Sequence, residues 1–255
     1  MNRRPFSRVL RTSGFLCLLL WPVALYAAST TRPAVGERVP SEDAVLKDLH
    51  SLGLINGQLN IFRCACPVRD IAKGMGTTQP SEAQLSRARL RMNRLYDLGI
   101  RTVFSFQDPG VTSAGGESND VAVSVALERA ACIGSGIRYV WRPMANAGPN
   151  SMQTMTDQQV MDQIDPISVE IFDAAREGGV AFHCSAGHDR TGIVAAYIRL
   201  KYQHWPVDQA IDEMRRYGHN WPKFSADGGV SSWHEQHLRA IDLLLKRHDR
   251  VTTTR

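Results

Sequence analysis

Residues 178–192, GGVAFHCSAGHDRTG, decide the fold of this chain. A pair of glycines leads into three apolar residues at 180–182, and so short an apolar run predicts a buried strand. A helical pattern begins at Thr191 and continues to about Gln203. Between them lies a short loop around Gly187, which has no side chain and so allows a positive φ. The stretch therefore predicts a strand, a tight loop and a helix N-terminus in direct succession.

The loop carries residues suited to a tetrahedral anion. Backbone N–H groups of such a loop can turn inward, and the first turn of the next helix adds free donors and the positive end of its dipole. Arg190 offers a planar fork that binds two oxygens at once. The same positive field favours the thiolate of Cys184, which is then a nucleophile beneath a bound phosphoryl group. The residues expected to surround the phosphate are Ser185, Ala186, Gly187, His188, Asp189, Arg190 and Thr191.

Strand and helix patterns alternate on either side of this loop. Strands are expected at 101–106, 137–142 and 180–182, and helices at 81–99, 121–132, 156–177, 191–203, 207–217 and 233–247. Capping boxes at 81–84 and 156–159 begin two of the helices, and Pro166 is expected to bend the second. Strands separated by helices, followed by a helical C-terminal part, predict an α/β fold with helices flanking a small, mostly parallel sheet.

The charge of the chain is concentrated at its N-terminus. The 30 Lys and Arg against 25 Asp and Glu give a net charge of +5, which alone would suggest a nucleic-acid or membrane-surface partner. Residues 1–13 hold four of the arginines and no acid, and a mostly apolar run follows at 14–28. That run is shorter than the roughly 20 residues that span a bilayer. The pattern is typical of a secretory signal peptide, with cleavage near Ala27, Ala28 or Ser29; an uncleaved anchor is the alternative.

Removal of residues 1–28 leaves 30 − 4 = 26 basic and 25 acidic residues, a net charge of +1. This near-neutral balance argues against a nucleic-acid partner, and no integral membrane span is expected after cleavage. The remaining chain is long enough for one domain with a sizeable core. We expect a polar lead-in at 29–42, a single domain at 43–249 and a tail at 250–255.

Residues 183–192, HCSAGHDRTG, resemble the HCxxGxxRTG signature of the cysteine-dependent protein tyrosine and dual-specificity phosphatase superfamily. The similarity covers about residues 55–220, through NIFRCACP (60–67), GIRTVFSF (99–106), GIRYVWRPM (136–144) and WPVDQAIDEM (205–214). It implies the compact dual-specificity phosphatase-like fold of exported bacterial members. It also implies a phosphocysteine intermediate on Cys184, with Arg190 binding the transferring phosphoryl group. Thr191 would bond the thiolate, His183 would orient the loop, and no metal or organic cofactor is expected.

Cleavage of a phosphomonoester also needs a proton for the leaving oxygen. Dual-specificity relatives often place an Asp two or three residues after the proline that ends the preceding strand, but Pro143 here is followed by Asn146. Three other carboxylates are candidates. Asp189 ranks first, because some bacterial and phosphoinositide-directed relatives share the DRTG ending. Asp157, 27 residues before the nucleophile, ranks second, and Asp108 in a Pro-Gly turn ranks third.

These patterns favour an exported, periplasmic or secreted phosphatase. Its substrate would be phosphotyrosine in proteins or a phosphorylated small molecule such as an inositol phosphate or a phosphoinositide. Asp189, with no acid after Pro143, favours the small molecules. Asn146 leaves open a phosphate- or phosphopeptide-binding module that has lost catalysis. Sulfurtransferase chemistry fits the Arg-Thr-Gly helix start less well.

Two further sequence features carry expectations. Cys64 or Cys66 is expected either to pair with Cys132 in an oxidising compartment or to remain a buried thiol, as the others would. Cys184 must stay reduced, and a low-pKa thiolate is easily oxidised, so redox sensitivity is expected. The HEQH stretch at 234–237 spaces its histidines three residues apart rather than the four of a metalloprotease helix, which predicts a solvated helix face.

Overall fold

The computed structural model describes residues 49–55, 59–73, 79–109, 118–145, 151–219 and 233–253. The chain divides into two units, Met1–Arg32 and Pro33–Arg255, and every described residue belongs to the second. The expected signal peptide, the lead-in and Asn146 lie outside the described residues. Among the described helices, none combines the length and apolar character needed to cross a membrane.

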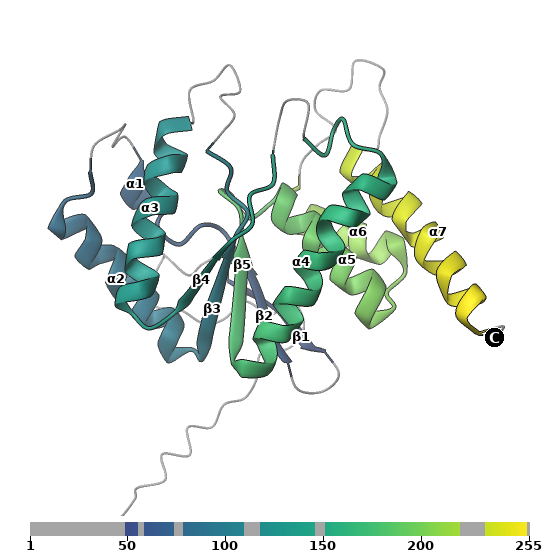
Figure 1. Cartoon of the computed structure of the whole chain (residues 1–255), viewed down its shortest axis with the longest axis horizontal. Helices are drawn as coiled ribbons and strands as arrows, with labels where there is room; N and C mark the ends of the chain where they lie inside the picture. Colours follow the sequence, from purple (N-terminus) through teal and green to yellow (C-terminus); the bar gives the residue numbers. More distant parts are fainter. Residues whose placement is uncertain are drawn as a thin grey trace, which may run out of the picture. The chain divides into compact units, whose positions relative to one another are not determined.

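The described strands form one sheet in the order β1-β2-β5-β3-β4 (Figure 1). They are β1 (His50–Ile55), β2 (Leu59–Cys64), β3 (Ile100–Ser105), β4 (Arg138–Trp141) and β5 (Gly179–His183). β1 runs antiparallel to β2, whereas the pairs β2–β5, β5–β3 and β3–β4 are parallel. The expected small, mostly parallel sheet is confirmed, and the strand that leads into the HCSAGHDRTG loop lies at its centre.

Helices cover both faces of this sheet (Figure 1). On one side lie α1 (Arg69–Ala72), α2 (Glu82–Asp97) and α3 (Ser118–Gly134). On the other side lie α4 (Asp157–Glu177), α5 (Asp189–Gln203), α6 (Val207–Arg216) and α7 (Trp233–Thr253). Successive strand side chains point to opposite faces. Val180 and Phe182 of β5 therefore join the core beneath α4 and α5, whereas Ala181 joins the core beneath α2 and α3.

The helix starts follow their sequence signals. Both capping boxes are formed. The side chains of Ser81 and Thr156 accept hydrogen bonds from the backbone N–H groups of Gln84 and Gln159, and the side chains of these glutamines accept from the backbone N–H groups of Ser81 and Thr156. Pro166 lies inside α4 without ending it. These two expected helix starts are confirmed.

Helix α5 is the central helix of the second layer. Its residues 190–200 are all buried, and it contacts α4, α6, α7 and the strands β1, β2 and β5. It begins at Asp189, two residues earlier than the sequence pattern predicted. Because α5 is held along its whole length, the loop at its N-terminus is anchored at one end by the helix and at the other by the central strand.

Candidate active site

The loop between β5 and α5 packs closely against the end of β2. Gly187 has φ +77°, and a Cβ at this position would lie 2.6 Å from the carbonyl oxygen of Cys64. The backbone N–H of Cys66 donates to the carbonyl of Ser185 at 3.2 Å. The buried guanidinium of Arg63, also in β2, donates to the carbonyl of Gly187 at 2.7 Å. The chain segment at 63–66 thus fixes two of the loop's carbonyls, which leaves the loop's N–H groups to face the anion.

Cys184 lies in this loop with only 3% of its surface exposed. Burial by itself would raise the pKa of the thiol, but several groups oppose it. The charge of Arg190, the hydroxyl and N–H of Thr191 and the N–H of Gly187 all stabilise the thiolate. Their sum lowers the pKa of Cys184 below its ordinary value. The arrangement therefore favours the thiolate, which is the nucleophilic form of cysteine.

Arg190 occupies the first turn of α5 and is held from the neighbouring strands. Its Nη1 donates to the carbonyls of Phe106, just after β3, at 3.0 Å and of Met144, after β4, at 3.2 Å. A guanidinium has five N–H donors in a rigid fork, and these two contacts involve one of its nitrogens. The side chain is thus fixed in place by the sheet with donor capacity left for an anion above Cys184.

Asp189, the first-ranked proton donor, is paired with a histidine. Its Oδ1 lies 2.7 Å from Nδ1 of His219, at the end of the segment that follows α6, and its side chain is 27% exposed. Burial would raise the pKa of Asp189, but the hydrogen bond to His219 and smaller electrostatic contributions from the neighbouring histidines outweigh it and lower that pKa. Asp189 is therefore ionised at neutral pH when the loop is empty.

The other two acid candidates are placed differently. Asp157 lies in the first turn of α4, with its Oδ1 2.6 Å from Nδ1 of His237 and its side chain 47% exposed. This contact ties it to α7 rather than to the loop. Asp108 lies two residues beyond Phe106, whose carbonyl Arg190 binds. Of the two positions after Pro143 that relatives use, Ala145 carries no carboxylate and Asn146 lies outside the described residues.

The HEQH stretch corrects one sequence prediction. His234 is fully buried and His237 nearly so, instead of lying on a solvated face. The ring of His234 packs edge-on against that of His219, with centroids 4.8 Å apart. Burial lowers the pKa of His234 well below its ordinary value, so the ring is neutral. The helix turns these histidines inward because α7 packs on α4, α5 and α6, a long-range contact that spacing within the helix does not reveal.

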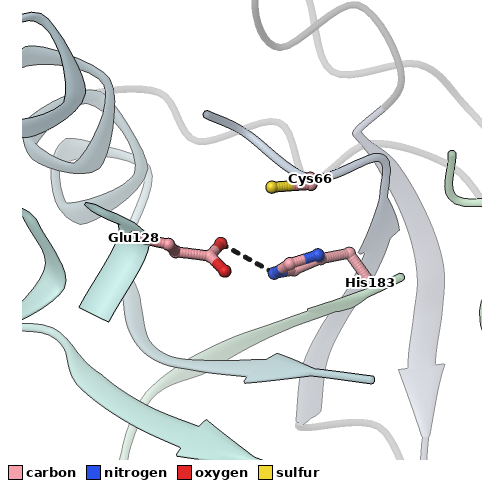
Figure 2. A group of neighbouring side chains, drawn as sticks. All are labelled: Cys66, Glu128 and His183. Atoms are coloured by element: carbon pink, nitrogen blue, oxygen red, sulfur yellow. Dashed lines mark ion pairs between the residues drawn. The ribbon is translucent and has the colours of Figure 1, made fainter. Parts of the chain in front are cut away.

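Behind the loop, three buried polar side chains meet (Figure 2). The Sγ of Cys66, a carboxylate oxygen of Glu128 and a ring nitrogen of His183 lie within 4.8 Å of one another. These donor types suit a transition metal. However, Nε2 of His183 is 2.7 Å from Oε1 of Glu128, whereas two ligands on one tetrahedral zinc lie about 3.3 Å apart, given bonds of about 2.0 Å. The geometry is that of a direct ion pair.

The described cysteines 64, 66, 132 and 184 are buried, and each is a thiol and not part of a disulfide. The structure thus has the buried thiols, and not the disulfide, of the two sequence alternatives. Sγ of Cys66 lies 3.2 Å from Oγ of Ser124, and Sγ of Cys132 lies 3.5 Å from Sδ of Met92. Burial raises the pKa of both thiols, which leaves Cys184 as the described cysteine with a lowered pKa.

Sequence reasoning missed three residues that support the loop, namely Arg63, Glu128 and His219. Arg63 interrupts an otherwise apolar strand, and Glu128 interrupts the apolar pattern of VAVSVALERAACI. Charged residues are seldom fully buried unless they are paired, so a charge within an apolar run is a usable signal. His219 gives no comparable local signal.

Comparison with known proteins agrees with this site. The chain matches the model of the Tyrosine phosphatase family over residues 82–201. The signature loop on the central strand and this match support assignment of the chain to the cysteine-dependent protein tyrosine and dual-specificity phosphatase superfamily.

Individual relatives are more distant. The dual specificity protein phosphatase TpbA of Pseudomonas aeruginosa is 36% identical over 80 residues, which are 31% of this chain and 36% of the relative. The chain thus matches little more than a third of that relative's length. A crystal structure of P. aeruginosa TpbA aligns over 78% of this chain and 90% of that one, with 19% identity and a TM-score of 0.44. A second, of a TpbA variant in complex with pTyr, aligns over 81% and 94%, with 17% identity and a TM-score of 0.46.

Proposed function

We propose that this protein hydrolyses phosphomonoesters through a phosphocysteine intermediate on Cys184. The observation that carries the proposal is the buried Cys184 in a strand–loop–helix, with a lowered thiol pKa and with Arg190 fixed beside it by two carbonyls. A lowered thiol pKa combined with a positive, donor-rich loop is an arrangement typical of nucleophilic cysteine catalysis.

In the first step the thiolate of Cys184 attacks phosphorus. The S–P bond forms as the P–O bond to the leaving group breaks, and the leaving oxygen takes a proton. Arg190 and the loop N–H groups bind the three equatorial oxygens, where charge is concentrated in the transition state. In the second step water attacks phosphorus and gives a proton to the carboxylate that the first step left ionised. The S–P bond breaks, and inorganic phosphate and the thiolate are released.

Asp189 is the acid that we propose for the first step. It is ionised in the empty enzyme, but a bound phosphate dianion places negative charge near it, and like charges disfavour ionisation and raise the pKa of a carboxyl group. Solvent can supply the proton, because the Asp189 side chain is 27% exposed. Substrate binding would therefore load the acid that the reaction needs.

The substrate class follows from two considerations. The named relative is a dual specificity protein phosphatase, and one solved structure of it contains pTyr, which supports phosphotyrosine. The DRTG ending and Asp189 support inositol phosphates or phosphoinositides. We propose phosphomonoesters of these two kinds, with the choice between them made by assay.

The test compares the wild type with Cys184→Ser and Arg190→Lys on p-nitrophenyl phosphate, phosphotyrosine peptides and inositol phosphates. Turnover by the wild type, no turnover by Cys184→Ser and a severe loss in Arg190→Lys are expected, because Lys cannot supply the bidentate fork. Acid quenching of the wild type should trap phosphate on Cys184. Binding of phosphopeptide with no turnover of any substrate would instead establish a binding module.

We also propose that the chain is exported to the periplasm or secreted. Four arginines in residues 1–13, followed by the apolar run at 14–28, support this. Expression of the full chain in a bacterium, cell fractionation and N-terminal sequencing test it. A product beginning near residue 28–30 outside the cytoplasm is expected, and an uncut chain in the cytoplasm would contradict export.

A further inference from the structure

His183 is fully buried, and both of its ring nitrogens face oxygen atoms. Nδ1 lies 2.9 Å from the carbonyl oxygen of Cys184, and Nε2 lies 2.7 Å from Oε1 of Glu128. A carbonyl oxygen can only accept, so Nδ1 carries a proton. An ionised carboxylate can only accept as well, so Nε2 carries a second one. With Glu128 ionised, the ring is an imidazolium.

The groups around the pair do not supply another counter-charge. On the side of α3, the Cys66 and Cys132 thiols and the Tyr139 phenol all have raised pKa values, because of burial and the charge of Glu128. These three groups are therefore neutral at physiological pH. In the sheet, Cys64 of β2 and Ser105 of β3 are the register partners of His183. Within the described residues, His183 is the cation that faces Glu128.

We propose that Glu128 is a positioning residue: it holds His183 as an imidazolium, and through it holds the Cys184 carbonyl so that the loop favours a thiolate. The inference deepens the proposed function, on which it rests, by assigning a role to a residue of α3, on the opposite side of the sheet from α5. His183 contacts the Cys184 carbonyl through Nδ1. Glu128 faces the opposite ring nitrogen, Nε2, so the negative member of the pair lies one side chain further from Cys184 (Figure 2).

The orientation of the pair determines the sign of its effect. Burial would lower the pKa of His183, but the charge and hydrogen bond of Glu128 and the Cys184 carbonyl and thiolate raise it overall. The imidazolium therefore persists to a higher pH than that of an ordinary histidine and is lost as the pH rises through that raised pKa. A neutral glutamine at position 128 can donate its amide N–H to an unprotonated Nε2 and supplies no charge. His183 then becomes neutral, and the Cys184 thiolate loses a nearby cation.

The experiment measures the rate of Cys184 alkylation by iodoacetamide against pH, with a chelator present, in the full chain. The test variant is Glu128→Gln, and the matched control is Glu235→Gln. The control also removes the charge of a buried carboxylate, since Glu235 of α7 lies 2.7 Å from Arg215 of α6. Phosphate protection identifies the alkylated thiol as Cys184. We expect Cys184 to be alkylated about tenfold more slowly in Glu128→Gln than in the wild type at pH values below the pKa of its thiol, which corresponds to a rise of about one unit in that pKa. Glu235→Gln should react at the wild-type rate.

Equal alkylation profiles for Glu128→Gln and the wild type would overturn the proposal. A second measurement does not depend on how Glu128→Gln folds: nitrogen-15 NMR of histidine-labelled wild type should show a doubly protonated ring at neutral pH whose signal is missing in His183→Gln. A singly protonated His183 would equally overturn it. Neither readout needs turnover, so failure of the proposed phosphatase activity would be seen separately.

Discussion

At the residue scale, Gly187 is where the loop and β2 approach most closely. We expect Gly187→Ala to lower the free energy of unfolding by about 2 kcal/mol or more and to abolish activity. An L-residue at φ +77° costs roughly 1–2 kcal/mol, and the new Cβ would lie 2.6–2.8 Å from backbone atoms of residues 64 and 65, which cannot rotate away. Urea denaturation and the phosphatase assay measure both effects.

Gly192 provides the comparison for that prediction. A Cβ there would meet Cγ of Met214 at 2.7 Å, but the methionine side chain is flexible. Alanine also stabilises a helix interior by about 1 kcal/mol relative to glycine. Gly192→Ala should therefore change stability much less than Gly187→Ala. A tolerated Gly187→Ala with intact turnover would show that the loop does not need this backbone conformation.

Asp189 is the second residue with a specific kinetic signature. Loss of a general acid matters most when the leaving oxygen is strongly basic, because p-nitrophenolate leaves readily without a proton. We expect Asp189→Asn to lose roughly 10²-fold in rate on phenyl phosphate and considerably less on p-nitrophenyl phosphate. The measurement is kcat/KM for both esters in the wild type, Asp189→Asn and Asp157→Asn.

The same comparison can reject the assignment. An equal loss on both esters in Asp189→Asn would mean that Asp189 positions the loop and does not donate the proton. A loss confined to phenyl phosphate in Asp157→Asn would move the acid to α4, despite the contact of Asp157 with His237.

At the element scale, a buried ion pair joins α5 to α6. Arg199 is fully buried and donates to Glu213 through Nε at 2.8 Å and Nη2 at 2.5 Å, while its Nη1 donates to the carbonyl of Leu52 at 2.5 Å. Removing one partner of a buried pair leaves an uncompensated charge, which typically costs about 3–5 kcal/mol. We expect Glu213→Ala to lose stability of this order in urea denaturation, and activity to fall at temperatures where the wild type is stable.

A surface pair on α6 provides the control. Asp208 bonds Arg239 of α7 at 2.7 Å, but its side chain is 74% exposed. Exposed pairs contribute about 0–1 kcal/mol, so Asp208→Ala should be nearly neutral. Similar losses in the two variants would mean that α6 is held by apolar packing and not by Arg199.

The elements differ in how well the sequence predicts them. Both capping boxes and the apolar run of β5 act locally, and each was predicted to within a few residues. β1 was missed, because Gly53 sits in a register irregularity between Ser51 and Leu54 and breaks the alternating pattern of a strand. Its pairing with β2 is decided by tertiary contact.

The residues of the candidate site likewise divide into those that local sequence predicts and those that only tertiary packing brings together. Cys184, Gly187 and Arg190 lie within seven consecutive residues, so their spacing alone brings them together. Glu128 contacts His183, which lies 55 residues further along the sequence, because α3 packs on the sheet. His219 contacts Asp189, which lies 30 residues earlier in the sequence, through the segment after α6. No local pattern encodes such pairs, and for this reason the sequence predicted the loop but not its supports.

At the scale of the whole molecule, the described thiols separate into one reactive and several protected groups. Cys184 has a lowered pKa, whereas burial raises the pKa of Cys66 and Cys132. Thiolate is the form that peroxide and disulfide reagents attack. We therefore expect low peroxide concentrations to inactivate the enzyme by oxidising Cys184 and dithiothreitol to restore it, while the fold stays intact by circular dichroism.

Thiol counting with a chromogenic disulfide reagent checks this at neutral pH. The rapidly reacting class should be smaller by one thiol in Cys184→Ser than in the wild type, and denaturant should release Cys66 and Cys132 in both proteins. Inorganic phosphate, which occupies the loop, should slow the reaction of Cys184 and leave the other thiols unaffected. If peroxide instead unfolds the protein, or if Cys184→Ser keeps the full rapid class, the core does not protect its thiols, and the low pKa of Cys184 does not explain redox sensitivity.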